Sequence, residues 1–245
     1  MQLAPSLHQI GSDIVNCYLV EEGGLVTIID AGLPGHWREL LDELRRMGHS
    51  LDDVRALLLT HGDTDHIGFA ARLHGQCGIP IYVHELDAAR ARGDVKKASS
   101  GWGPVKLGPL AAFVAYGALR GGLRVPPVRE LEILRAGTQL DLPGSPEVIA
   151  TPGHTPGSVA YYVRSVSAVF VGDAMTTRNV LTGERGPRPA PFTLDPPQAD
   201  ASLEQLATLD ARWVLPGHGP AWGGGAAEAV DRYRSTAAVH ARSAA

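Results

Sequence analysis

The sequence predicts an α/β fold in which helices cover β-sheets. Three observations support this prediction. Strand and helix patterns alternate through the first half of the chain, from residue 14 to residue 84. Short strands joined by turns follow in the second half, between residues 137 and 175. Each half also runs from strands to a helix and then to a strand that ends in a histidine-bearing loop, which gives the chain weak two-fold character.

The elements of the first half are bounded by local signals. The first two strands are joined by a turn at Glu22-Gly23-Gly24, and Gly48 ends the first helix, whose apolar residues recur at helical spacing. Asp65 is expected near the N-cap of the second helix. In chain order we predict strands over residues 14–22 and 25–30, a helix over 36–48, a strand over 54–60, a helix over 65–78 and a strand over 79–84.

The second half begins with short strands and ends in helices. In chain order we predict strands over residues 147–151, 158–163 and 168–173, a helix over 200–209, a strand over 211–219 and a C-terminal helix over 223–245. Residues 93–130 fit neither half, because they are rich in Gly, Pro, Ala and apolar side chains. Trp102, Leu110, Phe113 and Tyr116 in this insertion must either pack on the main body as a lid or meet a partner.

Composition restricts the class of protein. A chain of 245 residues with 44% apolar residues can form one domain over residues 1–245. A net charge of −4, without a basic stripe, argues against a nucleic-acid partner. The N-terminus has no signal-peptide pattern, and no apolar run reaches the length of a membrane span. Cys17 and Cys77 do not make a disulfide framework, so we expect a cytoplasmic protein.

The stretch LLLTHGDTDHIG, residues 57–68, places four potential metal ligands within six residues. It starts in the predicted buried strand, and a rigid sheet can hold the side chains of such a loop at one point. His61, Asp63 and Asp65 alternate and therefore share one side of the loop, whereas His66 points elsewhere. This arrangement favours two adjacent metal ions over one.

Three more predicted strands end at a candidate ligand. His154 lies in a loop bounded by proline and glycine, in TPGHTPGS. Asp173 follows the apolar strand in VFVGDA, and His218 lies in LPGHGP. The repetition of one pattern at separate strand ends is stronger support for a metal site than any single motif.

These motifs, in this order, resemble those of the metallo-β-lactamase fold superfamily of metallo-hydrolases, including its glyoxalase II and lactonase-like members. The early segments NCYLV and IIDAG are also similar to the family. The resemblance covers nearly the whole chain except residues 93–130. It implies a four-layer αβ/βα sandwich with a metal site at one edge, between the two sheets. It also implies that Asp30 supports the motif loop through hydrogen bonds.

The resemblance further implies two divalent metal ions, zinc in the first place, with iron or manganese as alternatives. The seven family ligand positions fall into three groups. The first metal would take His61, Asp63 and His154, the second would take Asp65, His66 and His218, and Asp173 would bridge the two.

The chain departs from the family at Asp63, where most hydrolytic members have histidine. Asp63 is either a ligand through one carboxylate oxygen, which adds negative charge to the site, or a residue that only hydrogen-bonds beside a degraded first site. The related flavodiiron proteins carry glutamate at this position in a di-iron site, so iron remains an alternative metal for this chain.

The leading functional hypothesis is a hydrolase of small-molecule substrates. A metal-bridging hydroxide would cleave an ester-like bond such as a thioester or lactone, with Asp65 carrying the proton to the leaving group. The first alternative is an iron-dependent enzyme acting on oxygen or sulfur compounds on the same fold. The second is a non-catalytic binding relative. A homodimer is a further option for the assembly.

Overall fold

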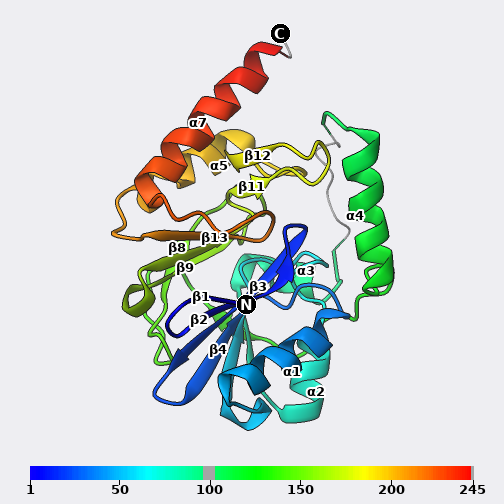
Figure 1. The fold of residues 1–245 in the computed structure, drawn as a ribbon, viewed down its shortest axis with the longest axis vertical. Coiled ribbons are helices and arrows are strands. Elements are labelled where there is room, and N and C mark those ends of the chain that lie inside the picture. Colours follow the sequence, from blue (N-terminus) through cyan, green and yellow to red (C-terminus); the bar gives the residue numbers. More distant parts are fainter. Residues whose placement is uncertain (96–102, 244–245) are drawn as a thin grey trace.

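The computed structural model describes residues 1–95 and 103–243, and in these ranges the chain forms two β-sheets that face each other between two layers of helices. Figure 1 shows α1 and α2 on the outer side of the first sheet and α5 and α7 on the outer side of the second. The predicted four-layer αβ/βα sandwich is therefore confirmed. Trp102, which the sequence analysis singled out, lies outside the described residues.

The first sheet has seven strands in chain order. They are β1 (Gln2–Ala4), β2 (Leu7–Ser12), β3 (Val15–Glu22), β4 (Leu25–Ile29), β5 (Val54–Leu58), β6 (Ile81–His84) and β7 (Glu132–Leu134). Neighbours from β1 to β4 are antiparallel, and neighbours from β4 to β7 are parallel. The carboxyl ends of β4 and β5 consequently lie side by side at one edge of the sheet.

The second sheet has the order β13-β10-β9-β8. Its strands are β8 (Glu147–Ala150), β9 (Val159–Val163), β10 (Ala168–Gly172) and β13 (Trp213–Pro216). β10 is antiparallel to β9 but parallel to β13, so β10 and β13 also end at one edge. A separate hairpin pairs β11 (Thr176–Arg178) with β12 (Arg185–Arg188).

Seven α-helices and three short 3-10 helices are present in the described ranges. The α-helices are α1 (His36–Met47), α2 (Ala70–Cys77), α3 (Ala88–Ala91), α4 (Leu107–Leu119), α5 (Pro196–Ser202), α6 (Glu204–Ala207) and α7 (Ala226–Ser243). The 3-10 helices are Leu51–Asp53, Glu85–Asp87 and Arg164–Val166. None of the described helices combines the length and apolar character needed to cross a membrane.

Three buried apolar clusters separate the four layers. Between the first sheet and its helices, the cluster includes Leu19, Ile28, Leu57, Trp37, Leu40 and Leu73. Between the two sheets, it includes Tyr18, Ile29, Leu58, Tyr161 and Phe170. Between the second sheet and its helices, it includes Tyr162, Val169, Leu206, Val230 and Tyr233. Because strand side chains alternate between faces, central strands such as β4 and β10 contribute to two of these clusters.

Three predicted helices have different bounds in the structure, and the C-terminal one, expected from residue 223, begins at Ala226. The helix expected over residues 65–78 begins only at Ala70, so Asp65 is not its N-cap. The backbone before Ala70 instead pairs with the loop after β4, because Ala31 donates to the His66 carbonyl at 2.6 Å and Gly68 donates to the Gly32 carbonyl at 2.7 Å. The helix expected over residues 200–209 starts at Pro196 and breaks at Leu203.

The 93–130 insertion contains α4, which stands along one side of the molecule in Figure 1. Both ends of this helix are held by the main body. At the first end, the Lys106 backbone donates to the Leu181 carbonyl at 2.9 Å. At the second end, Gly35 donates to the Arg120 carbonyl at 2.9 Å. The helix therefore connects the first half of the fold to the second across one edge.

Candidate metal centre

The loops at the carboxyl ends of β5, β10 and β13, together with the loop between β8 and β9, bring all seven predicted ligands together. Six of them are buried, and Asp65 is partly exposed. The residues are His61, Asp63, Asp65, His66, His154, Asp173 and His218. Three overlapping groups each place their ligand atoms within 4.8 Å of one another: His61, His66 and Asp173; His61, Asp63 and His154; and Asp65, His66 and His218.

Each of the four histidines uses Nδ1 for a hydrogen bond and turns Nε2 inward. The Nδ1 partners of His61, His66, His154 and His218 are, in that order, the Thr60 hydroxyl, the Asp30 carboxylate, the Thr193 hydroxyl and the Ile14 carbonyl. The Thr193 hydroxyl donates to the Ala190 carbonyl at 2.9 Å, so it accepts from His154. These contacts fix the tautomer that presents an unprotonated Nε2 to a metal.

Three buried atoms at the centre have no hydrogen-bond partner among the described residues. They are His61 Nε2, His66 Nε2 and Asp173 Oδ1. Buried polar atoms are otherwise almost always satisfied, because an unmade hydrogen bond in the interior costs about 1–3 kcal/mol. Imidazole nitrogens and carboxylate oxygens are the donor set that zinc, iron and manganese bind. The residues present therefore fit divalent metal ions.

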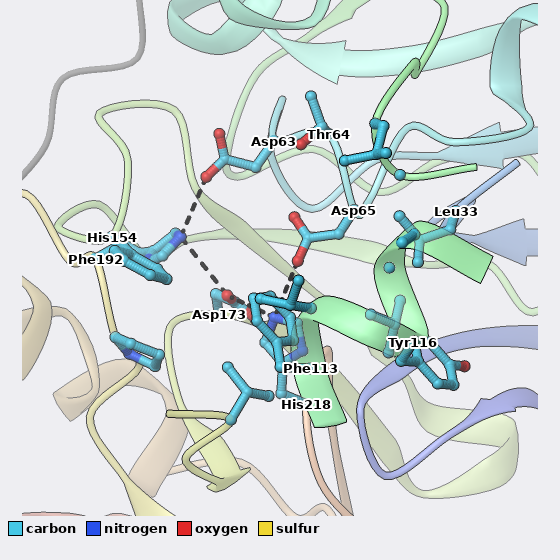
Figure 2. Close-up of a pocket in the computed structure, with 18 of the residues that line it drawn as sticks. Leu33, Asp63, Thr64, Asp65, Phe113, Tyr116, His154, Asp173, Phe192 and His218 are labelled. Atoms are coloured by element: carbon cyan, nitrogen blue, oxygen red, sulfur yellow. Dashed lines mark ion pairs between the residues drawn. The ribbon is translucent and has the colours of Figure 1, made fainter. Parts of the chain in front are cut away.

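The distances between the ligand atoms are close to those expected around a bound metal ion. Donor atoms that share a tetrahedral metal at about 2.1 Å lie about 3.4 Å apart. Asp63 Oδ2 lies 3.5 Å from His154 Nε2 and 3.8 Å from His61 Nε2. Asp65 Oδ2 lies 3.5 Å from His218 Nε2. Figure 2 shows Asp63 facing His154 and Asp65 facing His218.

Asp173 lies between the two groups. Its Oδ1 is 3.6 Å from His66 Nε2, and its Oδ2 is 3.6 Å from His154 Nε2 and 3.2 Å from His218 Nε2. Gly217 makes this approach possible, since a Cβ there would lie 2.7 Å from Asp173 Oδ1. One carboxylate therefore contacts histidines of both predicted metal sites.

The carboxylates of the centre favour positive charge beside them, as protons on the histidines or as bound cations. Burial alone raises the pKa of Asp173, but the facing histidines His218, His66 and His154 hold it well below its usual range. Burial lowers the pKa of His66 and of His218, yet nearby carboxylates raise these values to about 10 and about 9. Burial and the neighbouring histidines lower the pKa of His61. Bound cations would replace protons at this cluster.

Asp30 holds the motif loop from the end of β4. Its Oδ1 accepts from the Thr60 backbone at 2.8 Å, and its Oδ2 accepts from the Thr60 hydroxyl and lies 2.8 Å from His66 Nδ1. Asp30 has a φ of 60°, a left-handed conformation that is uncommon outside glycine and concentrates at functional sites. The hydrogen bonds expected from the resemblance are present in the structure.

The comparisons with known proteins agree with this geometry. The sequence profile of the metallo-β-lactamase superfamily matches residues 10–218. The chain belongs to the metallo-β-lactamase superfamily. A relative in the superfamily, the probable metallo-hydrolase YflN of Bacillus subtilis (strain 168), is 28% identical over 241 residues, which cover 89% of this chain and 85% of YflN. An uncharacterized protein of the same bacterium, YobT, is 30% identical over 216 residues, which cover 84% of this chain and 83% of YobT.

Two solved structures extend the comparison. The metallo-β-lactamase family protein TTHA1429 from Thermus thermophilus has a TM-score of 0.68 and 26% identity, covering 98% of this chain and 81% of that protein. TTHA1623, solved in a di-iron-bound form, has a TM-score of 0.61 and 31% identity, covering 88% of this chain and 93% of that protein.

Sequence reasoning missed Asp87, a buried carboxylate that clamps two ligand loops of this metallo-β-lactamase fold together. Asp87 Oδ2 accepts from the Gly62 backbone at 2.7 Å and from the Thr155 hydroxyl at 2.9 Å, and Oδ1 accepts from the Gly157 backbone at 2.9 Å. Gly62 is next to His61 and Asp63, and Thr155 is next to His154. In the sequence, an aspartate at the start of a short helical segment reads as an ordinary helix cap.

Replacing Asp87 with alanine should destabilise the fold and loosen the metal site together. Three buried donors would lose their acceptor, so we expect the free energy of unfolding to fall by about 2–4 kcal/mol. Denaturant titration of the metal-free protein measures this loss. The exposed Asp141→Ala serves as the control, and an Asp87→Ala protein as stable as Asp141→Ala would contradict the clamp.

A pocket of about 390 Å³ opens over the candidate ligands. Its floor includes Asp65, Asp173 and His218, and its walls are mostly apolar. The apolar wall residues include Leu33, Phe113, Val114, Val180 and Phe192. Phe113 comes from α4, and Figure 2 places it beside the ligand cluster. The described part of the insertion thus supplies part of the pocket wall, and its role as a lid stays a prediction.

His36 and Tyr116 join α1 to α4 at the rim of this pocket. His36 Nδ1 accepts from the Leu33 backbone at 3.0 Å, so Nε2 carries the proton that it donates to the Tyr116 hydroxyl at 2.8 Å. Burial lowers the pKa of His36 to about 4; Glu39 opposes this shift, and the Arg120 guanidinium adds to it. The joint therefore requires a neutral imidazole.

This joint predicts a pH-dependent stability. The folded pKa of His36 lies below the unfolded value of about 6.5, so the unfolded chain binds the extra proton between the two values. Stability should be fully present above pH 6.5 and should fall by on the order of 3 kcal/mol as the pH drops towards 4. Unfolding of metal-free protein and of His36→Gln measures it, and equal slopes in the two proteins would refute the prediction.

Proposed function

We propose that this protein is a metal-dependent hydrolase that cleaves an ester-like bond in a small molecule. One observation carries the proposal: three buried ligand atoms lack a hydrogen-bond partner among the described residues, and one of them belongs to Asp173, which lines an apolar-walled pocket. The name of YflN, a probable metallo-hydrolase, supports the same reaction class. The apolar walls suit an acyl group beside a thioester or a lactone.

In this proposal two divalent cations are held by the seven ligands, with zinc as the first choice and iron or manganese as alternatives. Bound cations would supply Lewis acidity and lower the pKa of a water molecule. Asp63 belongs to the first site with His61 and His154. Asp65, His66 and His218 form the second site, and Asp173 joins the two.

The protein's own residues position the substrate and carry the proton. Phe113 and Phe192 would exclude water from the acyl side of the pocket. Asp65 is the ligand most open to the pocket, with 23% of its side chain exposed, and its Oδ2 faces His218. Asp65 is therefore placed to take a proton from the attacking water and return it to the leaving group.

A hydrolysis screen tests the proposal. Purified protein reconstituted separately with zinc, iron and manganese would be assayed against lactones, thioesters, phosphodiesters and β-lactams. We expect turnover of a lactone or thioester that disappears with a chelator and returns with metal. Metal-loaded protein that leaves every ester-like substrate intact would contradict the proposal.

An iron-dependent redox enzyme is the second candidate. Two observations favour it: TTHA1623 was solved in a di-iron-bound form, and Asp63 adds a hard oxygen ligand to the first site. Elemental analysis of protein purified without added metal separates the candidates. Iron together with oxygen consumption would favour the redox enzyme, and zinc without oxygen consumption would favour the hydrolase.

The proposed partner is a small-molecule substrate. A homodimer, the absence of nucleic-acid binding, a single domain over residues 1–245 and a cytoplasmic location stay predictions from the sequence. Leu107 and Leu119, at the two ends of α4, are each 85% exposed and would be the first place to look for a dimer contact.

A further inference from the structure

Arg90 forms a buried ion pair with Asp63, the residue at which the chain departs from its superfamily. Arg90 Nε donates to Asp63 Oδ1 at 2.8 Å. The Arg90 side chain is 10% exposed and the Asp63 side chain is 12% exposed, so both charges are largely removed from water. An ion pair at this depth is strongly coupled, because the screening that weakens surface pairs is small.

The local fold forces this contact. Arg90 lies on α3, and the loop that carries Asp63 packs directly against that helix. A Cβ at Gly62 would lie 2.7 Å from the Ala91 nitrogen and 3.0 Å from Arg90 Cβ, so only glycine allows this approach. The Gly62 backbone is also tied to the start of α3 by its hydrogen bond to Asp87. The packing of the Gly62 backbone against α3 therefore places Asp63 beside Arg90.

The two oxygens of Asp63 face different partners. Oδ1 accepts from Arg90, whereas Oδ2 lies 3.5 Å from His154 Nε2 and 3.8 Å from His61 Nε2. With Oδ1 held by the guanidinium, Asp63 presents a single oxygen to the first site. It thereby resembles the single nitrogen that histidine presents at this position in other members of the superfamily.

The charges match in the same way. A carboxylate in place of imidazole adds one negative charge to the centre, and the guanidinium adds one positive charge at contact distance. The Asp63–Arg90 pair is neutral as a unit, like the imidazole it replaces. An unpaired extra carboxylate would weaken the Lewis acidity of a bound cation, and the pair limits that effect.

We infer that Arg90 is a positioning residue that makes Asp63 a one-oxygen metal ligand and offsets its charge. The inference rests on the proposed metal-dependent function. It assigns Arg90 no contact with the reacting atoms, and it makes positions 63 and 90 a coupled pair. A chain with histidine at position 63 should have no such need for arginine at position 90.

A double-mutant cycle tests the coupling through metal affinity, measured by chelator competition and elemental analysis without any substrate. Arg90→Gln alone should weaken binding at the first site about 10- to 100-fold. Arg90→Lys, which keeps the charge but not the planar fork, should weaken it less. Asp63→His should retain metal, and adding Arg90→Gln to Asp63→His should change the affinity less than about threefold.

Three outcomes would overturn the inference. Equal losses from Arg90→Gln in both backgrounds would indicate a general structural role. A metal affinity that Arg90→Gln leaves unchanged would show that Arg90 does not position Asp63 as a ligand. A wild-type protein that binds no metal would remove the proposed function and the inference together, whereas the first two outcomes leave the proposed function intact. Melting temperatures of the variants, with Arg90→Lys as the conservative member, identify any loss of folding.

Discussion

Replacing Asp173 with alanine should remove most of the bound metal and nearly all turnover. Asp173 contacts His66 with one oxygen and His154 and His218 with the other, so its loss takes a ligand from both proposed sites at once. Cations supply several kcal/mol of charge stabilisation in reactions of this class, so we expect turnover to fall by at least about a thousandfold.

The measurement is metal content per chain after dialysis, together with the rate of hydrolysis. Asp141→Ala is the matched control, because Asp141 is exposed. Without the Asp173 carboxylate, the three nearby histidines repel one another when protonated, and this repulsion could unfold the variant. Circular dichroism therefore checks that the variant is still folded. An Asp173→Ala protein with the metal content of Asp141→Ala would exclude a bridging role.

Replacing Asp65 with asparagine should abolish proton transfer while preserving much of the metal. Asparagine keeps a carbonyl oxygen near His218 but cannot accept and return a proton. We expect kcat to fall by about 10²- to 10⁴-fold, with a smaller change in metal content. The non-catalytic alternative predicts instead that Asp65→Asn changes nothing.

Steady-state kinetics and elemental analysis of the same preparation measure both quantities. Asp65→Glu provides the comparison, because it retains a carboxylate and should keep more activity than the asparagine variant. If Asp65→Asn lost its metal completely, the second site would depend on the charge of Asp65, and the proton-transfer role would rest on the glutamate variant alone. Full activity in Asp65→Asn would rule out the proton-transfer role.

The convergence of the ligands was predictable because each lies in a loop at a strand end. Apolar runs identify β5 and β10, and the polar residues that follow them must emerge where these strands stop. His61 and Asp173 are separated by more than a hundred residues, yet both loops reach the same edge of the sandwich. Sequence pattern therefore located the candidate site without any knowledge of side-chain geometry.

The helix bounds were less predictable, because tertiary contacts decided them. Residues 65–69 have an acceptable helical sequence, but Gly68 and His66 pair with the loop after β4 instead. Helix α4 was obscured by Pro109, which lies in the first turn of the helix, where a missing N–H has no intrahelical acceptor to lose. Local sequence alone does not distinguish a break from a tolerated first-turn proline.

Asp87 and Arg90 could not be found from the sequence. In HELDAARARG both residues read as polar positions on a short helical segment, which are usually solvated. Their roles depend on Gly62, which lies far from them in the chain and presses the motif loop against α3. Residues that support a site from an unrelated segment carry no spacing signal.

Anomalous diffraction from crystals of the metal-reconstituted protein, recorded at the absorption edge of the bound element, tests the central claim most directly. The account predicts two peaks about 3.5–4 Å apart, one among His61, Asp63 and His154 and one among Asp65, His66 and His218, with Asp173 between them. A map with no peak at these seven residues, from protein shown by elemental analysis to hold metal, would contradict it.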